Sequence, residues 1–470
     1  MPSITAPSSP HVLVVPFPAQ GHTLALLDLA ALLAARGLRL TVVTTPGNAH
    51  LLSPLLAAHP SSIRPLTLPF PSHPSLPAGL ENLKACPPIY AAVFVHALAA
   101  LHHPILAWTK SQPHPVVAVL SDFFCGWTQP LAAELGVPRL VFAPSGVLGT
   151  AIPHSLFRRS VKPRPSNDAV GFPGIPGEPA YQWKELSIMY KMHAEGLVEA
   201  RLGEAVKQNF LWNLESWGFV SNTFRALEGR YLDTPLEDLG SRRVWAVGPV
   251  APETAVHRGG EAAVGAGELG AWLDAFPEGS VVYVCFGSQV VLTPPVAAAL
   301  AEALERSAVP FVWAVGAGDE DGGDVVPEGF EAKAKRRGLV VRGWAPQVAA
   351  LRHAAVGWFV THCGWNSVLE SVAAGVPMLA WPMTADQFAN ARLVVDEARV
   401  AVRACEGGVG VSPDAAELTA VLRNAAGGGE ECRSVRARAK ELAAEAAAAV
   451  RGGGSSCQDL ESLVQEIRKL

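Results

Sequence analysis

Residues 11–45 read HVLVVPFPAQGHTLALLDLAALLAARGLRLTVVTT and contain a strand–helix–strand pattern. The apolar runs 11–18 and 38–45 have the length of buried strands, and the stretch 23–37 between them is helix-like. Short buried strands that alternate with helices are typical of a parallel sheet covered by helices on both faces. The alternation returns with a strand over 116–122, a helix over 128–136 and a strand over 137–144.

A second array of this kind follows the loosely patterned segment 145–250. Its expected strands cover 280–288, 310–316, 339–344, 356–362 and 377–382, and its expected helices cover 294–307 and 364–375. The Ala-rich segment 433–470 predicts two further helices, broken at 451–456.

These patterns predict an α/β fold with two Rossmann-like doubly wound domains that face each other across a cleft. A Gly- and Ala-rich stretch without a period separates the two arrays and is typical of a linker. We expect an N-terminal domain over 1–248, the linker over 249–270, a second domain over 271–450, and a C-terminal helix over 451–470 that packs back on the first domain. Ligands bind outside the carboxyl ends of parallel strands, so the cleft is the expected place for a small molecule.

Composition and charge exclude two classes of protein. The chain of 470 residues is 49% hydrophobic and 17% charged, which is too apolar for a disordered chain. Lys and Arg number 37 against 42 Asp and Glu, a net charge of -5. Because no basic excess is available to neutralise phosphates, a nucleic-acid partner is disfavoured.

The cysteines and the N-terminal sequence indicate a reducing compartment. The seven cysteines form no C-x-x-C pair, and no basic-then-apolar signal pattern opens the sequence. The stretch from Pro87 to Trp108 has no formally charged residue, but its histidines and prolines favour a core helix plus a turn over a membrane span. We therefore expect a cytoplasmic monomer without an integral membrane segment.

Polar residues are densest after the strand 356–362, where the chain reads HCGWNSVLESVAAGVP over 362–377. Gly364 allows a tight turn, and Asn366 and Ser367 are suitable N-cap residues for the next helix. A helix N-terminus after a strand presents backbone N–H groups that bind phosphate. Glu370, one turn later on the same face, is placed to accept hydrogen bonds from ribose hydroxyls.

His362 and Trp365 flank this turn and would reach the same ligand. The alternative is that Asn366 only caps a structural helix and that Trp365 lies in the core.

The 44 residues 344–387, WAPQVAALRHAAVGWFVTHCGWNSVLESVAAGVPMLAWPMTADQ, resemble the donor-binding signature box of plant UDP-dependent glycosyltransferases of secondary metabolism, family 1. The resemblance implies a GT-B fold, with the acceptor in the N-terminal domain and a UDP-sugar in the second. For the nucleoside, it implies that Trp344 stacks on the uracil, that Ala345 and Gln347 lie at the base and ribose, and that Glu370 holds the ribose hydroxyls. For the diphosphate, it implies binding by His362, Asn366 and Ser367. For the sugar, it implies binding by Trp365, Asp386 and Gln387.

Two details of the resemblance bear on the donor. Gln387, at the last position of the box, is typical of members that use UDP-glucose, although it does not exclude related sugars such as UDP-rhamnose or UDP-xylose. The sequence CFGS at 285–288 resembles the family's second phosphate-side turn, which implies that Ser288 reaches the diphosphate.

His22 and Asp122 form a candidate acid–base pair. His22 lies on a Gly-containing turn after the first strand, and its ordinary pKa near 6.5 suits proton removal. Asp122 ends another strand, and the ends of parallel strands converge at one edge of a sheet. A carboxylate on one imidazole nitrogen fixes the tautomer and stabilises the imidazolium. Alternatively, His22 is a turn residue and Asp122 caps a turn; the family's catalytic His and Asp fall at matching places.

The implied reaction is an inverting transfer of glucose from UDP-glucose to a hydroxyl of a small phenolic acceptor such as a flavonoid, which forms a β-O-glucoside. The departing diphosphate is met by a helix N-terminus, His362 and Ser288, so no metal and no other cofactor is required. C-glycosylation of an electron-rich ring, and a nucleotide-sugar-binding protein without catalysis, remain as alternatives.

Two further patterns are set aside. GAGELG at 265–270 fits G-x-G-x-x-G, but no apolar strand precedes it. Asp319, Glu320 and Asp321 resemble the D-x-D motif of metal-dependent glycosyltransferases, but such a charge run among glycines is typical of a solvated loop.

Aromatic residues near the strand ends of the first domain are candidates for acceptor binding, because rings suit a flat phenolic ligand. For each of them, ordinary core packing is the alternative. The candidates are Phe17, Phe123, Phe124, Trp127, Phe142 and Trp183.

Overall fold

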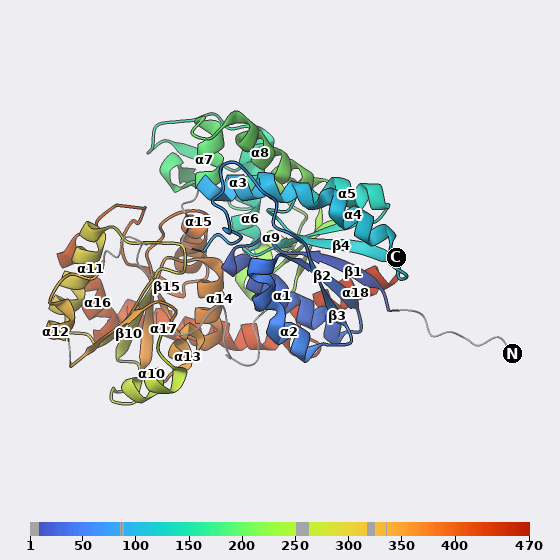
Figure 1. Cartoon of the computed structure of the whole chain (residues 1–470). Helices are drawn as coiled ribbons and strands as arrows, with labels where there is room; N and C mark the ends of the chain where they lie inside the picture. Colours follow the sequence, from blue (N-terminus) through green and yellow to red (C-terminus); the bar gives the residue numbers. More distant parts are fainter. Residues whose placement is uncertain (1–8, 85, 87–88, 251–262, 317–324, 335) are drawn as a thin grey trace. The chain divides into compact units, whose positions relative to one another are not determined.

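The computed structural model describes residues 9–84, 86, 89–250, 263–316, 325–334 and 336–470 (Figure 1). The contacts among these residues divide them into two compact units. The first unit contains the described parts of 1–183, 188–251 and 449–470, and the second contains those of 184–187 and 252–448. The chain therefore leaves the first unit, forms the second, and returns to the first with its last helix.

The first unit is built on a seven-stranded sheet in the order β3-β2-β1-β4-β5-β8-β9, with all neighbours parallel. Its strands are β1 (His11–Val15), β2 (Arg39–Thr44), β3 (Ile63–Thr67), β4 (Val116–Asp122), β5 (Arg139–Ala143), β8 (Gly218–Ser221) and β9 (Arg243–Ala246). The order runs outward in both directions from the pair β1 and β4. Such a reversal opens a crevice at the carboxyl ends of the two strands, which is the usual ligand position in doubly wound sheets.

Helices and a short hairpin complete the first unit. The helices are α1 (Gln20–Ala35), α2 (Ser53–Ala58), α3 (Ile89–Leu98), α4 (His102–Lys110), α5 (Thr128–Leu135), α6 (Val147–Arg159), α7 (Ile188–Ala194), α8 (Ala200–Leu214), α9 (Arg225–Leu232) and α18 (Ser455–Arg468). The hairpin pairs β6 (Ala169–Gly171) with β7 (Ala180–Gln182) in antiparallel orientation.

The core of the first unit joins residues from both ends of the sequence. Leu26 and Leu33 of α1 pack with the apolar strand residues, and Leu463 and Ile467 of α18 belong to the same cluster. The red helix α18 of Figure 1 packs against β9, the last strand of this sheet. The last helix therefore fills part of a core that the first residues begin.

The second unit repeats the same topology with six parallel strands in the order β12-β11-β10-β13-β14-β15. Its strands are β10 (Val281–Cys285), β11 (Phe311–Val315), β12 (Gly338–Arg342), β13 (Val356–Thr361), β14 (Met378–Ala380) and β15 (Ala401–Arg403). Here the order reverses between β10 and β13, so the second crevice lies after these two strands.

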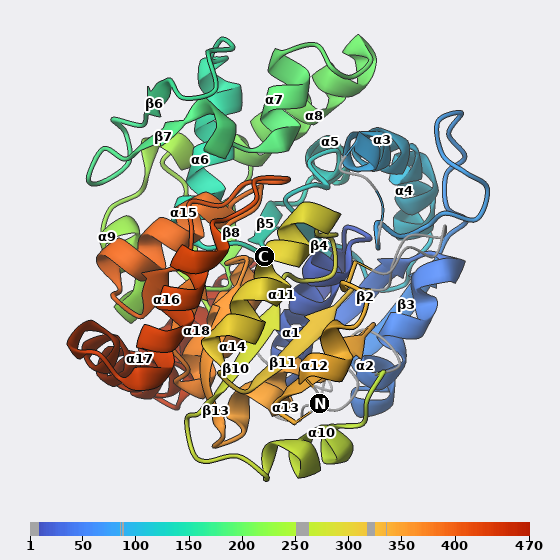
Figure 2. The same ribbon diagram turned by 90° about the vertical axis from the view of Figure 1, so that its left-hand side faces the viewer.

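The helices of the second unit cover its sheet, and Figure 2 shows α11 and α16 side by side. They are α10 (Ala266–Leu273), α11 (Pro294–Ser307), α12 (Phe330–Ala334), α13 (Gln347–Arg352), α14 (Trp365–Ala374), α15 (Gln387–Arg392), α16 (Ala415–Gly427) and α17 (Glu430–Val450).

The expected α/β fold is confirmed, and the structure corrects several local expectations. Helix α10 begins at Ala266, inside the stretch that was expected to be linker, and the GAGELG sequence forms its first turns. The segment 145–250, in which the sequence shows no clear pattern, contains α6, α7, α8 and α9 with two further strands of the sheet. The run Asp319 to Asp321 lies outside the described residues.

One stretch, Tyr90–Lys110, is long and apolar enough to cross a membrane by length and composition. Half of its most apolar window is buried inside the protein, and a 3-10 turn at Ala99–Leu101 separates α3 from α4. Helix α3 packs against α8, and α4 packs against α5. These are the contacts of a core helix followed by a turn.

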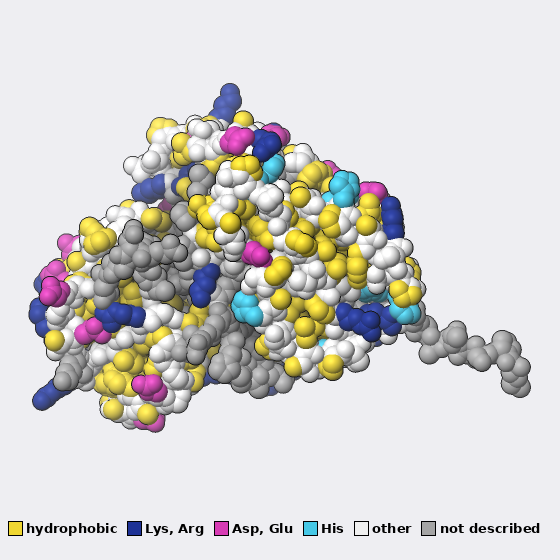
Figure 3. All heavy atoms as spheres, viewed as in Figure 1, with side chains coloured by type: hydrophobic (Ala, Val, Ile, Leu, Met, Phe, Trp, Pro, Cys, Tyr) yellow, Lys and Arg dark blue, Asp and Glu magenta, His cyan; other side chains and the backbone are white. Residues whose placement is uncertain are grey.

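Charged side chains are sparse and mixed on the visible surface. On the face in Figure 3, Lys and Arg side chains are dispersed among acidic, His and uncharged side chains. This distribution agrees with the low charged fraction of the sequence, 17%.

Candidate active site

The crevice of the first sheet brings His22 and Asp122 together. Asp122 is the last residue of β4, and His22 lies in the first turn of α1, after β1. Their strands are neighbours, with Val15 opposite Ser121. His22 Nδ1 lies 3.0 Å from Asp122 Oδ2 although the residues are 100 positions apart.

This geometry defines the tautomer of the histidine. The second oxygen of Asp122, Oδ1, accepts a hydrogen bond from the backbone N–H of Phe124 at 2.9 Å. Because the carboxylate accepts on both oxygens, Nδ1 of His22 carries the proton and Nε2 keeps its lone pair. Asp122 is fully buried, whereas the His22 side chain is 22% exposed. The pair therefore has one nitrogen available to accept a proton from a ligand.

Aromatic rings hold the imidazole in its plane. The rings of Phe123 and Phe124 stack on His22, with centroid distances of 5.5 and 5.2 Å and interplanar angles of 24° and 17°. Phe17 adds a tilted contact at 5.7 Å. Three of the aromatic residues expected at an acceptor site thus surround the candidate base, although Phe17 itself is fully buried.

The other expected acceptor residues are placed differently. Phe142 is part of the core beneath the sheet and has no exposed surface. Trp183 is also buried, and its Nε1 donates a hydrogen bond to Glu195. For these two residues the structure shows ordinary packing, because neither ring reaches a surface that a ligand could contact.

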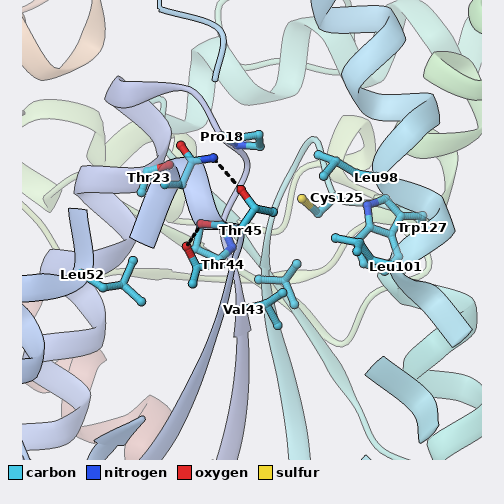
Figure 4. Close-up of a pocket in the computed structure, with 13 residues that line it drawn as sticks. Pro18, Thr23, Val43, Thr44, Thr45, Leu52, Leu98, Leu101, Cys125 and Trp127 are labelled. Atoms are coloured by element: carbon cyan, nitrogen blue, oxygen red, sulfur yellow. Dashed lines mark hydrogen bonds between the residues drawn. The ribbon is translucent and has the colours of Figure 1, made fainter. Parts of the chain in front are cut away.

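Trp127 lines a pocket in the first unit, shown in Figure 4. Apolar side chains from α3 and the following turn, Leu98 and Leu101, form one side of it with Trp127. The opposite side is more polar, since Thr23 and Thr45 line it and Asn48 Nδ2 donates to Thr45 Oγ1 at 2.9 Å. The pocket is mainly apolar with a few hydrogen-bonding groups at one edge, which is the usual character of a small-molecule pocket.

In the second unit, His362 follows β13 directly and the helix α14 begins three residues later. The expected N-cap at Asn366 or Ser367 is wrong, because Gly364 is the N-cap and Trp365 is already helical. Gly364 has φ −60° and ψ 140°, and no side chain caps the helix. Asn366 and Ser367 therefore lie within the first helical turn, where N–H groups and the helix dipole favour an anion.

The ring of His362 lies between two glycines. A Cβ atom on Gly364 would be 2.3 Å from His362 Nε2, and one on Gly287 would be 2.7 Å from the same atom. Gly287 has φ +78° and belongs to the turn after β10 that also carries the exposed residue Ser288. The ends of β10 and β13 thus meet at this imidazole, at the point where the strand order reverses.

Burial lowers the pKa of His362 to about 4. The ring is therefore neutral near pH 7, so it offers a hydrogen-bonding group rather than a cation.

Hydrogen bonds link several other residues of the 344–387 segment. Gln347 Nε2 donates to Ser367 Oγ at 3.1 Å and to Glu370 Oε2 at 2.8 Å. Gln347 is the first residue of α13 and follows the half-buried Trp344 and the buried Ala345. The structure therefore brings Gln347, expected at the base and ribose, together with Glu370 and Ser367, expected at the ribose and the diphosphate.

A residue that was not expected, Asn390, connects two parts of this site. Its Nδ2 donates to the backbone oxygen of Cys363 at 2.9 Å and to Asp386 Oδ2 at 3.0 Å. Gln387 is tied to its own loop, because its Oε1 accepts from the N–H groups of Met383 and Thr384. The four-residue spacing from Asp386 to Asn390 on one helix is the signal that could have indicated this contact.

Across the part of the chain that the structure describes, no three His, Cys, Asp or Glu side chains lie close enough to hold a metal ion.

Relatives and solved structures match nearly the whole chain, and a family model matches part of it. The family model described as "UDP-glucoronosyl and UDP-glucosyl transferase" matches residues 257–423. Flavonol 3-O-glucosyltransferase UGT89B1 from Arabidopsis thaliana is 46% identical over 99% of this chain and 97% of the relative. UDP-glycosyltransferase 89B2 from Stevia rebaudiana is 44% identical over 99% and 100%. The crystal structure of Arabidopsis thaliana UGT89C1 complexed with UDP-L-rhamnose superimposes with a TM-score of 0.80 at 35% identity, covering 98% of this chain and 99% of that chain.

Proposed function

The chain belongs to the plant family 1 UDP-dependent glycosyltransferases of GT-B fold, and from this membership we propose that it transfers glucose from UDP-glucose to a hydroxyl of a small phenolic acceptor. Two observations from relatives support the acceptor class. A relative 46% identical is named a flavonol 3-O-glucosyltransferase, and a structure at 35% identity was determined with quercetin. The product of the proposed reaction is a β-O-glucoside.

The observation that carries the proposed chemistry is the 3.0 Å contact between His22 Nδ1 and Asp122 Oδ2. Nε2 of His22 removes the proton of the acceptor hydroxyl, and Asp122 stabilises the resulting imidazolium. The acceptor oxygen attacks the anomeric carbon of the α-linked glucose from the opposite side. The bond from that carbon to the diphosphate breaks, and UDP leaves with the electron pair, so the configuration inverts.

The second unit supplies the groups that suit the donor. The first turn of α14, with Asn366, Ser367 and the neutral His362 beside it, suits the diphosphate, and Ser288 adds a hydroxyl. Trp344 supplies a flat face for the uracil, and Glu370 with Gln347 suits the ribose.

Asp386 and Gln387 suit the sugar, and Trp365 and Ala345 complete the proposed donor set. No metal ion and no other cofactor is part of this proposal. A cytoplasmic location is in keeping with seven cysteines that are all free thiols.

The test is transfer from UDP-glucose to a flavonol, followed by NMR of the product linkage. Replacing His22 with Ala should abolish transfer because the proton acceptor is lost, while UDP binding to the second unit should persist. His50→Ala removes an exposed histidine of the same unit and serves as the matched control. Full activity in His22→Ala would overturn the assignment.

A second donor has specific support. A relative that is 36% identical over 98% of this chain is named flavonol 7-O-rhamnosyltransferase. Competition between UDP-glucose and UDP-rhamnose in one assay decides between the sugars. We expect glucose to be preferred, because a Gln at the last position of the 344–387 segment, here Gln387, is typical of family members that use UDP-glucose.

A further inference from the structure

Arg139 is a buried cation without a counter-ion at bonding distance. It is the first residue of β5 and is 1% exposed. Its Nε donates to Ser121 Oγ at 3.0 Å and to Thr128 Oγ1 at 2.7 Å, and its Nη2 donates to Asn213 Oδ1 at 2.9 Å. Among the described residues, no carboxylate lies within ion-pair distance of it, and Nη1 has no hydrogen-bond partner. Burial of such a charge is costly, so its retention calls for a physical explanation.

The hydrogen bonds of Arg139 hold the turn that follows Asp122. Nη2 donates to the backbone oxygen of Cys125 at 3.3 Å. Asn213, which accepts from Arg139, donates through Nδ2 to the backbone oxygen of Phe123 at 2.8 Å, and Asn209 makes a second bond of 2.8 Å to the same oxygen. The turn is thereby fixed between β5 and α8.

The turn packs closely against Asn209 at Gly126. Its N–H donates to Asn209 Oδ1, and a Cβ atom added there would lie 2.2 Å from the backbone oxygen of Asn209. A shift of this segment would therefore break contacts on both sides of it.

The same turn carries the groups that orient the proposed base. The N–H of Phe124 holds Asp122 Oδ1, and the rings of Phe123 and Phe124 stack on His22. Any displacement of the turn would therefore tilt the imidazole and release one oxygen of the carboxylate.

The charge of Arg139 also interacts with the Asp122 carboxylate. The titratable groups around it are Asp122 on β4, Cys125 on the turn and His154 on α6, with His22 beyond Asp122. Burial raises the pKa of the Cys125 thiol well above its usual range and lowers the pKa of His154 to about 4, so both are neutral near pH 7. Burial lowers the pKa of Arg139 to about 9, which leaves it protonated, and Asp122 opposes that lowering.

We infer that Arg139 is a positioning residue for the His22–Asp122 pair, which fixes the turn 123–127 by hydrogen bonds and balances the Asp122 carboxylate with its charge. This inference rests on the proposed function of that pair. The guanidinium contacts neither His22 nor the proposed reacting atoms, and it acts through its hydrogen bonds to the turn and to Asn213.

Two substitutions separate shape from charge. In Arg139→Met both are lost, so kcat should fall by roughly 10- to 100-fold with the KM for UDP-glucose unchanged. The acid limb of the profile of kcat/KM against pH should also move upward, because a positive charge that opposes protonation of the pair is gone. In Arg139→Lys the charge stays, so kcat should fall while the acid limb stays in place.

A variant at the neighbouring position tests the charge independently of the stability of Arg139→Met. Asn213→Asp places a carboxylate at the atom that now accepts from Nη2, so it neutralises the guanidinium without removing it. Because it also loses the Nδ2 group that donates to the backbone oxygen of Phe123, its kcat should fall too, and its acid limb is the readout that reports on charge. Its acid limb should move upward as in Arg139→Met. Arg36→Met, which removes an arginine paired with Glu461 at the surface of the same unit, is the control and should leave both readouts unchanged.

The outcomes distinguish this inference from the proposed function. If folded Arg139→Met and Asn213→Asp retain the parental kcat, or if their acid limbs superimpose on the parental one, the inference is overturned. If the parent shows no transfer, or if His22→Ala is fully active, the proposed function fails instead.

Discussion

The position of the His362 imidazole depends on the absence of side chains at two neighbouring glycines. Its ring occupies space that side chains at Gly287 and Gly364 would take. The two glycines are not equivalent, because Gly287 has φ +78° whereas Gly364 has φ −60°, which any residue can adopt. A substitution at Gly364 therefore tests only the space that the His362 ring needs, without backbone strain.

Gly364→Ala should weaken UDP binding by about 10-fold or more, since its Cβ would lie 2.3 Å from His362 Nε2 and displace the ring. The measurement is calorimetric titration with UDP. Gly427→Ala, in α16, adds a methyl group with no atom within 4 Å and serves as the matched control, with unchanged affinity. Equal affinities for both variants would contradict the role given to this space.

Asp122→Asn should keep the shape of the pair but lose its charge. The amide can still contact Nδ1, yet it stabilises neither the tautomer nor the imidazolium, so kcat should fall by roughly 100-fold or more. The KM for UDP-glucose should stay the same, because Asp122 lies in the first unit. Steady-state kinetics with both substrates varied provide the measurement. A parental kcat in this variant would show that the carboxylate does not assist His22.

His154 links stability to pH. It is fully buried between Thr150 and Asn213, and burial lowers its pKa from about 6.5 to about 4. The unfolded chain takes up a proton below pH 6.5, whereas the folded chain resists it until about pH 4. The stability from this neutral ring is therefore complete above pH 6.5 and is lost as the pH falls toward 4.

The loss at His154 should amount to about 3 kcal/mol across this window. Denaturant unfolding at pH 7.5, 6 and 5 measures the slope of the free energy of unfolding with pH, and His154→Gln should flatten that slope. An unchanged slope would show that another group is responsible.

At the scale of elements, the start of α6 depends on a distant carboxylate. Glu228 of α9 is completely buried, and its two oxygens accept from the N–H groups of Val147 and Leu148 at 2.8 and 2.9 Å. The N-cap Gly146 supplies no side chain, so Glu228 replaces the missing cap.

Glu228→Gln should lower the free energy of unfolding by about 1–3 kcal/mol, because an amide cannot accept both hydrogen bonds and the charge at the helix N-terminus is lost. Glu237→Gln, an exposed carboxylate paired with Arg158, should change it by less than about 1 kcal/mol. Thermal unfolding followed by circular dichroism compares the two, and equal effects would refute the capping role.

Elements with clear boundaries could be predicted from the sequence. The helix over 294–307 matches α11 because Thr293 and Pro294 mark its start, and it ends where Ala308 takes φ 61°. Short strands such as β15, with three residues, have no period to detect. Helix α6 carries Pro153 in its interior, which opposes a helical prediction, although most of its residues are buried in the folded unit.

The same contrast applies to the candidate site. His22 and Asp122 could be predicted because Asp122 ends a strand and His22 follows the neighbouring strand, and strand ends of one sheet converge. The contact of Asn390 with Cys363 and that of Arg139 with Asn213 could not, since tertiary packing alone brings these residues near. Only the contact of Asn390 with Asp386 has a signal in the sequence, the spacing of four residues.

At the scale of the whole molecule, the first unit is built from segments at both ends of the described chain. Helix α18 buries Leu463 and Ile467 in its core, and Asp459 accepts from the N–H of Ala246 at 2.9 Å. Ser456 Oγ donates to the backbone oxygen of Gly248 at 2.6 Å. Helix α18 is therefore an integral part of the first unit.

Leu463→Ala should reduce the free energy of unfolding by about 2–4 kcal/mol, because a fully buried side chain leaves a cavity. Glu461→Ala on the same helix removes only the surface pair with Arg36 and should cost less than about 1 kcal/mol. The comparison uses urea unfolding of the whole chain followed by tryptophan fluorescence, and similar costs would show that α18 adds little to the core.

The discontinuous first unit also determines the order of events at the ribosome. Roughly 200 residues separate its second segment from α18, and at about 5–20 residues per second they take about 10–40 s to synthesise. During that interval the second unit can complete its own sheet, while the first unit exposes the apolar surface that α18 later covers. Nascent chains halted before Ser455 should therefore recruit chaperones to the first unit, although its catalytic residues were translated first.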